Sequence, residues 1–513
     1  MSKTIIIIGA GLAGLSAALQ AAENGCNVKL VSSFPSERAQ SVMAEGGINA
    51  ALNTKDENDS PEEHFTDTIK AACGLADPNA VWGMTQAAPE LVHWLLKLGV
   101  KFNMSGYDDV DLRNFGGQKK KRTAFAQSDT GKQMTAMIDA VRRKEASGMV
   151  ERFSHHSFLT LRLCGNICCG CVIRDEYSQE TVELPGDAVI VATGGMHGLF
   201  GNTTGSLSNT GEVTAELFRL GVPLANGEMI QYHPTTVKCG GKRMLISEAA
   251  RGEGGRLFAM KDGKQWYFME EKYPELGNLM PRDITAREIW KVSHESEVFL
   301  DMTEISDEII SNKLSGLADD CMTYLHKDIR KEPVSVLPGI HYFMGGILVD
   351  EQHRTPIQNL YAAGECCAQY HGANRLGGNS LLGALYGGRV AAKSACEQAD
   401  VVDLSCATQI DFPPASQISE IKQLNKVMQE TMGVVRNENT LLNGIQTVQA
   451  LTGNLPLLGM AVLKSALARK ESRGAHWRED YPKSNDDDYL KTTVARFDGK
   501  QIQISFVPVP ERR

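Results

Sequence analysis

The sequence lacks the features that would place the protein in a membrane or on a nucleic acid. It has no run of eighteen apolar residues, so we expect no transmembrane helix. It has no excess of positive charge: 53 Lys and Arg against 62 Asp and Glu give a net charge of -9, which argues against nucleic-acid and membrane-surface roles. A short polar start passes directly into a hydrophobic strand, so we expect no signal peptide. We therefore predict a cytoplasmic globular protein, and 513 residues suffice for two or three domains.

Twelve cysteines without a secretory signal predict reduced thiols. Four of them lie close together, and such a cluster is a candidate iron–sulfur or zinc site: Cys164, Cys168, Cys169 and Cys171. The dipeptide Gly165-Asn166 predicts instead a hairpin turn between two strands. Alternate residues of a strand point to opposite faces, so the four sulfurs would not all converge. We favour the hairpin over the metal site.

The N-terminus has the pattern of a dinucleotide-binding unit. Residues 4–8 form a β-branched run, and a glycine turn and an alanine-rich stretch to Glu23 follow it. This pattern predicts a strand, a tight turn and a helix, with a second strand at 28–31. The N–H groups at the start of the helix would bind a pyrophosphate. The acidic residue that usually binds ribose is missing, because Ser32 and Ser33 stand at the end of the second strand.

Two later segments repeat the pattern of an apolar strand followed by a glycine turn. Residues 187–195 end in Ala-Thr-Gly-Gly, as in two-stretch FAD-binding proteins, and include Thr193 and Gly194. Residues 359–365 end in Gly-Glu, where Glu365 is an acid able to bind a hydroxyl group. Three such returns predict one nucleotide domain built from discontinuous pieces. The alternative is three ordinary strand ends with glycine turns.

Five cationic side chains lie in unusual short segments of this acidic chain: His233, Arg251, Arg282, His341 and Arg375. Glycine or proline constrains the backbone around each of them. A convergent group of Arg and His would bind a small polyanion through guanidinium and imidazole donors. The alternative is a set of unrelated surface arginines and core histidines.

The composition along the chain suggests four parts. Residues 230–341 interrupt the nucleotide domain, which we assign to 1–229 and 342–405, and we interpret the insertion as a cap. Pro413-Pro414 indicates a linker, and apolar spacing at 418–428 and 441–448 predicts helices in a support domain over 415–480. The tail, 481–513, is predicted to hold a charged loop at Asn485 to Asp488 and two terminal strands.

Taken together, these segments resemble the flavoprotein subunit of fumarate reductase and succinate dehydrogenase. The resemblance covers nearly the whole chain and includes residues 122–131 (RTAFAQSDTG) and 468–480 (ARKESRGAHWRED). It implies an α/β fold with a discontinuous Rossmann-like FAD-binding domain, an inserted α+β capping domain and a C-terminal helical domain. Substrate would lie between the first two domains.

The resemblance also implies a role for each cation. His233, Ser247, His341 and Arg375 match the dicarboxylate clamp, with Ser247 in place of the more usual threonine. Arg282 matches the residue that transfers a proton to substrate. We expect His233 to be a catalytic residue as well as a member of the clamp. Glu248 and Arg251 match the proton relay, and their three-residue separation puts both on one face of a helical turn. A plain buried salt-bridge network is the alternative for the relay residues.

The FAD contacts that the resemblance implies come from seven segments. They are Gly9, Ala10, Gly11, Leu12, Ala13, Gly14, Ser32, Ser33, Gln40, Ser41, Ala44, Glu45, Gly46, Gly47, Thr193, Gly194, Glu212, Glu365, Ser380 and Leu381. Glu212 replaces the aspartate of the family pattern, which leaves one FAD contact open.

Two positions separate this chain from relatives. Phe115 stands where L-aspartate oxidases have a glutamate for the substrate ammonium, so it favours fumarate or succinate; generic core is its alternative. Gln40 replaces the histidine that bonds covalently to FAD in the membrane complexes, so we expect non-covalent FAD. Because covalent attachment is associated with a raised flavin potential in this family, its loss disfavours succinate oxidation more than fumarate reduction.

We therefore expect an FAD-dependent fumarate reductase. The rival predictions are succinate dehydrogenase, then L-aspartate oxidase, and, from another class, a non-catalytic flavin-binding subunit for assembly or sensing. Electrons would come from outside the chain. The family's complexes use an iron–sulfur subunit and a membrane anchor, which would associate this protein with a membrane, whereas soluble relatives use other reductants.

Overall fold

The computed structural model describes residues 2–107, 109–127, 129–206, 208–400, 407, 412 and 417–513. Its centre is a five-stranded parallel sheet with the strand order β20-β10-β1-β2-β6. The strands are β1 (Thr4–Ile8), β2 (Asn27–Ser32), β6 (Val150–Ser154), β10 (Ala188–Val191) and β20 (Leu360–Ala362). The three predicted strand–glycine segments are thus the neighbouring strands β20, β10 and β1, which confirms that distant pieces build one nucleotide domain.

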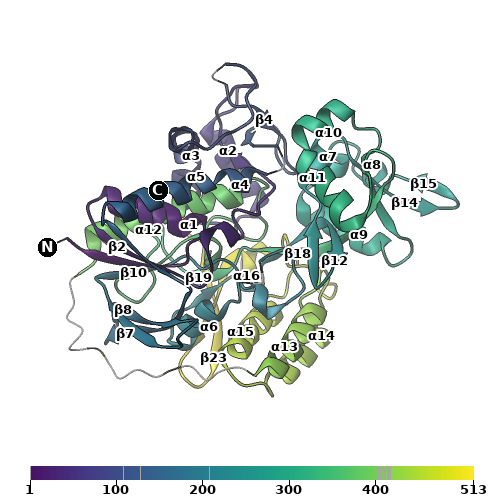
Figure 1. Cartoon of the computed structure of the whole chain (residues 1–513). Coiled ribbons are helices and arrows are strands. Elements are labelled where there is room, and N and C mark those ends of the chain that lie inside the picture. Colours follow the sequence, from purple (N-terminus) through teal and green to yellow (C-terminus); the bar gives the residue numbers. More distant parts are fainter. Residues whose placement is uncertain are drawn as a thin grey trace.

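The isoleucines of β1 explain how the sheet is covered on both faces. Ile5 and Ile7 pack in a core with α1 (Leu12–Glu23) and α12 (Asn379–Gln398). Ile6 and Ile8 point the other way, into a core shared with an antiparallel sheet of β7 (His156–Cys164), β8 (Ile167–Asp175) and β9 (Thr181–Pro185). Figure 1 shows α1 and α12 on one side of the sheet and β7 and β8 on the other. A continuous apolar run is what a strand buried on both faces requires.

The cysteine-rich segment forms the predicted hairpin. Its strands β7 and β8 meet at Gly165-Asn166, and a bulge shifts their register next to Gly170. Because of the bulge, Cys168 and Cys171 both enter the core under the parallel sheet, while the Cys169 thiol donates to the carbonyl of Arg162 at 3.2 Å. Within the part of the chain that the structure describes, no group of three or more His, Cys, Asp or Glu side chains is placed to hold a metal ion.

A helical layer follows β2 in the first half of the chain. Its helices are α2 (Pro61–Ala71), α3 (Pro78–Leu98), α4 (Thr130–Gln133) and α5 (Thr135–Ala146), with a small sheet of β3 (Ile48–Asn49), β5 (Thr123–Ala124) and β4 (Leu112–Arg113). Ser60 and Asp77 cap α2 and α3 by accepting hydrogen bonds from N–H groups of the first turn, and a proline follows each cap. Helices α2, α3 and α5 share an apolar core with α1 and α12 on one face of the parallel sheet.

The inserted segment builds an α+β region with a core of its own. One sheet has the order β13-β12-β18 and another β15-β14-β16-β17. The strands are β12 (Ile230–Cys239), β13 (Lys242–Leu245), β14 (Arg256–Lys261), β15 (Lys264–Trp266), β16 (Val298–Asp301), β17 (Val334–Ser335) and β18 (Leu337–Phe343). The helices are α7 (Glu248–Gly252), α8 (Phe268–Lys272), α9 (Arg282–Val292), α10 (Asp307–Lys313) and α11 (Ser315–Asp320). Figure 1 shows this region beside the nucleotide domain, at the right of the view.

The C-terminal region contains the predicted helices and strands. Helices α13 (Ile418–Thr431), α14 (Glu438–Val448) and α15 (Asn454–Ala468) share an apolar core with α6 (Glu212–Arg219). Strands β22 (Lys491–Phe497) and β23 (Ile502–Pro508) extend a sheet with β11 (Leu224–Ala225), β19 (Gly346–Leu348) and β21 (Cys367–Ala368). The predicted linker Pro413-Pro414 lies outside the described residues. The expected fold class is confirmed.

The prediction of a charged loop at Asn485 to Asp488 is wrong. The segment forms a one-turn helix, α16 (Asp486–Tyr489), because the Asn485 side chain accepts a hydrogen bond from the Asp488 N–H group. Three aspartates in the first turn also favour a helix, since negative charge is stabilised near the helix N-terminus.

Among the residues that the structure describes, no helix is both long and apolar enough to cross a bilayer.

Candidate active site

One cavity of ≈ 640 Å³ connects the glycine turn after β1 with the capping region. Nineteen of the twenty residues predicted to contact FAD line it, and the exception is Gly14. It is also lined by Phe115, His233, Ser247, Glu248, Arg282, His341 and Arg375. The predicted nucleotide site and most of the predicted substrate site are therefore two ends of one space, and Arg251 lies behind it.

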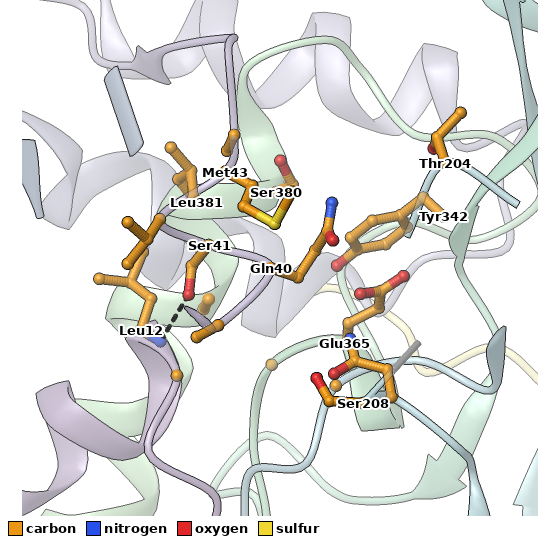
Figure 2. Close-up of a pocket in the computed structure, with 18 of the residues that line it drawn as sticks. Leu12, Gln40, Ser41, Met43, Thr204, Ser208, Tyr342, Glu365, Ser380 and Leu381 are labelled. Atoms are coloured by element: carbon orange, nitrogen blue, oxygen red, sulfur yellow. Dashed lines mark hydrogen bonds between the residues drawn. The ribbon is translucent and has the colours of Figure 1, made fainter. Parts of the chain in front are cut away.

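The nucleotide end of the cavity requires glycine. Gly9 has a φ of 109°, and a Cβ atom there would lie 2.3 Å from the carbonyl oxygen of Ala192. A Cβ atom on Gly14 would lie 1.9 Å from the carbonyl oxygen of Gly9, so Gly14 lets α1 pack closely on β1 rather than facing the cavity. The start of α1 faces the cavity, and the Leu12 N–H donates to Ser41 Oγ at 2.9 Å. Figure 2 marks this bond.

Beyond the nucleotide end, the wall of the cavity offers polar groups from three further segments. The start of α12 contributes Ser380 and Leu381, and helix N-termini favour bound anions or carbonyl oxygens. Gln40 projects into the cavity beside Tyr342, and its Oε1 atom is buried without a hydrogen-bond partner. Glu365 accepts a hydrogen bond from the Phe343 N–H at 3.1 Å. This cradle of glycines, helix N-termini and an unpartnered amide fits FAD.

The two histidines of the predicted clamp lie side by side because β12 and β18 are paired strands. The ring centroids of His233 and His341 are 5.1 Å apart in an edge-to-face arrangement. His341 Nδ1 is 2.8 Å from the Thr204 hydroxyl, and His233 Nδ1 donates to the carbonyl oxygen of Thr235 at 3.0 Å. Burial and the neighbouring cationic groups hold the pKa values of both histidines well below their ordinary value. Both shifts favour the neutral form of the ring.

Arg375 is buried without a salt-bridge partner among the described residues, although the charges of Glu365 and Glu248 act on it from a distance. Its guanidinium lies 4.3 Å from the centroid of the Tyr342 ring, its Nε atom has no hydrogen-bond partner, and it forms no ion pair with any carboxylate that the structure describes. Burial, with the nearby charge of Arg282, lowers the pKa of Arg375 to about 9. A buried cation in this state favours the arrival of an anion.

Arg282 is instead paired with a buried carboxylate. Its Nε and Nη2 atoms donate to Glu248 Oε2 at 2.8 and 2.5 Å. On the other side of Glu248, Oε1 accepts from Arg251 Nη2 at 3.3 Å and from the Gly116 N–H at 3.1 Å. Burial raises the pKa of the Glu248 carboxyl, but the charges of Arg282 and Arg251 outweigh it, so the pKa lies below its ordinary value. The predicted one-turn spacing of Glu248 and Arg251 on α7 is confirmed.

Ser247 and Phe115 complete the predicted substrate end. Ser247 caps α7 by accepting from the Ala249 N–H at 3.4 Å, and it lines the cavity. Phe115 is buried against the core of the capping region, with its ring close to Gly46. The aromatic ring thus borders both the glycine segment at 44–47 and the core of the capping region.

Sequence reasoning assigned no role to several residues that hold the cations. Gln231 contacts Arg282 and the loop of Arg375, Tyr342 lies against Arg375, Thr204 bonds to His341, and the Gly116 N–H bonds to Glu248. Gln231 and Tyr342 each stand within two residues of a predicted histidine, so the motif segments contained them. Thr204 and Gly116 lie far along the chain from His341 and Glu248, which they contact, and no local sequence pattern indicates these contacts.

Comparisons with known proteins agree with this geometry. The family model described as "FAD binding domain" matches residues 4–381, and "Fumarate reductase flavoprotein C-term" matches residues 451–512. The chain is 38% identical to the succinate dehydrogenase flavoprotein subunit of Bacillus subtilis, over 100% of this chain and 98% of that one. It is 32% identical to the 8-methylmenaquinol:fumarate reductase flavoprotein subunit of Wolinella succinogenes, over 100% and 92%.

Two further likenesses concern a neighbouring activity and the fold. The chain is 32% identical to an L-aspartate oxidase of Pyrococcus furiosus, over 94% of this chain and 97% of that one. A solved structure of FrdA of E. coli quinol fumarate reductase superposes with a TM-score of 0.90 at 27% identity, covering 99% of this chain and 97% of that one.

Proposed function

The chain belongs to the fumarate reductase and succinate dehydrogenase flavoprotein family, an FAD-binding family of oxidoreductases, and on that premise we propose that it reduces fumarate to succinate. The observation that carries this proposal is the meeting of unpaired Arg375 and paired Arg282 at one end of the FAD cavity. One arginine is free to bind a carboxylate, and the other is connected to further ionisable groups.

In our proposal, His233, Ser247, His341 and Arg375 bind the two carboxylates of the substrate. Arg375 brings an uncompensated positive charge, and the histidines gain protons when a dianion neutralises their surroundings. Cations at both ends of fumarate polarise its double bond toward attack by hydride. When bound, FAD would supply the hydride chemistry, and Gln40 and the start of α12 would help to hold it.

Arg282 then delivers the proton that the second carbon needs. Arginine is a weak acid, with a pKa above about 12, so it gives up a proton only as negative charge develops on the substrate. Glu248 holds two nitrogens of Arg282 and lies next to Arg251, so a proton that reaches its carboxylate from Arg251 can pass to Arg282 Nε or Nη2. This chain of contacts is what supports the relay over a purely structural ion network.

Phe115 supports a dicarboxylate without an amine. It is apolar and buried at the substrate end, so a substrate ammonium would find no carboxylate from this position. L-aspartate oxidase is accordingly the weaker candidate. Succinate dehydrogenase is the stronger rival, because the relative from Bacillus subtilis at 38% identity carries that name.

Gln40 supports non-covalent FAD and, with it, the reductive direction. An amide is not a nucleophile for the flavin, and its buried Oε1 is free for a hydrogen bond to it. We predict that acid denaturation releases all of the yellow colour into the supernatant, measured by its absorbance. Flavin that stays with the precipitated chain contradicts non-covalent binding.

The electron donor would be a second protein. Relatives are named as flavoprotein subunits, including one of an 8-methylmenaquinol:fumarate reductase, so we propose docking on an iron–sulfur subunit, with a membrane anchor beyond it. Membrane association would then come through those partners. Purification without denaturant, followed by identification of the chains that remain bound, tests the docking.

The deciding experiment is a dye-coupled assay of the FAD-loaded protein with fumarate, succinate and L-aspartate. We expect fumarate reduction with reduced viologen to be faster than succinate oxidation, and no oxidation of L-aspartate. Faster succinate oxidation would establish the dehydrogenase. Activity with L-aspartate would establish the oxidase, and inactivity with all three would favour a non-catalytic flavin-binding subunit.

A further inference from the structure

Resting on the proposed function, we propose that Asn374 and Asp283 form a lock that fixes the proton-donating arginine relative to the substrate-binding arginine. Each lock residue is the chain neighbour of one arginine. Asp283 follows Arg282 at the start of α9 in the capping region, and Asn374 precedes Arg375 in the loop before α12. A bond between the two lock residues therefore joins the two halves of the substrate site.

The contacts form a closed ring around the two arginines. Asn374 Nδ2 donates to Asp283 Oδ1 at 3.0 Å. Gln231 Nε2 donates both to Asn374 Oδ1 and to the carbonyl oxygen of Arg375, each at 2.9 Å. Gln231 Oε1 accepts from Arg282 Nη1 at 3.1 Å, which returns the ring to α9. Each hydrogen bond of the ring either joins the capping region to the nucleotide domain or involves one of the two arginines.

The lock uses both functions of the Asn374 amide. Its oxygen accepts from Gln231 and its nitrogen donates to Asp283, and the side chain is almost fully buried. An aspartate at 374 would keep the first bond and set a second carboxylate against Asp283. Removing one partner of a buried hydrogen bond costs the most stability when the other partner stays buried and finds no new hydrogen bond.

The lock opposes a repulsion within the site. Arg282 and Arg375 are both buried cations close enough to disfavour each other's charge before a dianion binds between them. Burial raises the pKa of the Asp283 carboxyl, and the charge of Arg287, whose guanidinium lies 4.0 Å from the centroid of the Trp477 ring, acts against that rise. The Asp283 carboxylate accepts the hydrogen bond from Asn374 in the first turn of α9, where negative charge is stabilised.

Neither lock residue lines the cavity, and neither does Gln231. They therefore touch neither substrate nor FAD, and their effect passes through Arg282 and Arg375. We class Asn374 and Asp283 as positioning residues. A shift of about 1 Å at a reacting group is enough to slow catalysis about 100-fold.

The test is a charge swap in the FAD-loaded protein, with four forms compared: wild type, Asn374→Asp, Asp283→Asn and the double variant. We expect Asn374→Asp to lower kcat/KM for fumarate about 30-fold or more, because like carboxylates oppose each other across the lock. Asp283→Asn keeps an acceptor for the Asn374 amide, so its loss stays within about fivefold. In the double variant, the carboxylate introduced at position 374 accepts from Gln231 and from the amide introduced at position 283, and kcat/KM returns to the Asp283→Asn value.

The swap also separates this inference from the proposed function. We expect the thermal unfolding midpoints of the four proteins to fall in the same order as their kcat/KM values, because the lock joins two parts of the structure. If wild type does not reduce fumarate, the proposed function fails, and the unfolding midpoints still decide the lock. A double variant no better than Asn374→Asp in both measurements overturns the lock.

A milder pair covers the case in which Asn374→Asp does not fold. Asn374→Ala, Asp283→Ala and their double form remove the bond without adding a charge. Coupled residues give a double variant less impaired than the product of the single effects. Strictly multiplicative effects on kcat/KM and additive effects on the unfolding midpoint overturn the lock.

Discussion

Arg282 and Arg375 lie at the same end of one cavity and are both buried, yet the surrounding chain treats them in opposite ways. Arg282 donates twice to Glu248 and once to Gln231, so its charge is compensated within the protein. Arg375 rests on the face of Tyr342, and its Nε atom has no hydrogen-bond partner. We call the part of the site around Arg282 the closed side, because its charges are paired within the protein. We call the part around Arg375 the open side, because its guanidinium has no salt-bridge partner among the described residues.

This difference shows how two chemically identical groups take different tasks. Desolvating an unpaired guanidinium costs free energy, which a bound carboxylate recovers, so the open side is suited to binding. A paired guanidinium gains little from a further anion, but its carboxylate partner offers a path for protons. His233 and His341 belong to the open side, since burial and nearby cations lower their pKa values and favour the neutral rings.

Replacing Arg282 is the strongest way to test the comparison. Arg282→Ala removes the proposed proton donor, so we expect kcat for fumarate to fall about 10³-fold or more. It also leaves the buried Glu248 carboxylate with only Arg251 and the Gly116 N–H as partners, and breaking a buried pair costs up to about 3–5 kcal/mol of unfolding free energy. Steady-state kinetics and denaturant unfolding measure the two effects.

Retained FAD, seen in the absorbance spectrum, is the control for the Arg282→Ala protein, because Arg282 lies at the substrate end. Normal turnover in this variant would refute the proton-donor role. A large loss of turnover without any loss of stability would instead show that Glu248 is not held as a charged partner.

Replacing Arg375 should give the reverse pattern. Arg375→Ala removes the open cation, so we expect KM for fumarate to rise about 100-fold, since hydrogen bonds to charged groups contribute about 1.5–3 kcal/mol each. Because no described carboxylate loses a partner, we expect the free energy of unfolding to stay equal or to rise. Kinetics and denaturant unfolding are measured as for Arg282→Ala.

Arg375→Lys is the matched control, because it keeps a positive charge but loses the planar fork. We expect its KM to lie between those of wild type and Arg375→Ala. Equal losses of stability in the Arg282→Ala and Arg375→Ala proteins would remove the contrast between the two sides.

Most of the nucleotide domain was predictable because its signals are local. The β-branched run at 4–8 and the glycine turn after it encode strand, turn and helix in consecutive residues. The other strand–glycine segments repeat that pattern, so their adjacency in the sheet followed from one fold rule. The charged turn at 485–488 was missed because Asn485 is favoured both in loops and as a helix cap.

The predicted cations could be named from the sequence, but their different states could not. Five Arg and His residues in constrained segments suggested an anion site, without telling which carboxylate would pair with which guanidinium. That distinction depends on Glu248 facing Arg282 and on Tyr342 lying against Arg375, which are contacts across 34 and 33 residues of chain. Asn374 and Asp283 are polar residues of ordinary type, and only the fold brings them together.

Tyr342 offers the finest test, because it is the one aromatic face on which Arg375 is seen to rest in the described chain. A cation–π contact contributes about 0.5–2 kcal/mol, so Tyr342→Leu should raise KM for fumarate about 3- to 30-fold with a smaller change in kcat. Tyr342→Phe keeps the ring and should stay within about threefold of wild type. If the Phe variant is as impaired as the Leu variant, the hydroxyl rather than the ring supports the site, and the open side is not held by an aromatic face. If neither variant changes KM, Arg375 is held by the loop before α12 alone, and the contrast with the hydrogen-bonded Arg282 becomes sharper still.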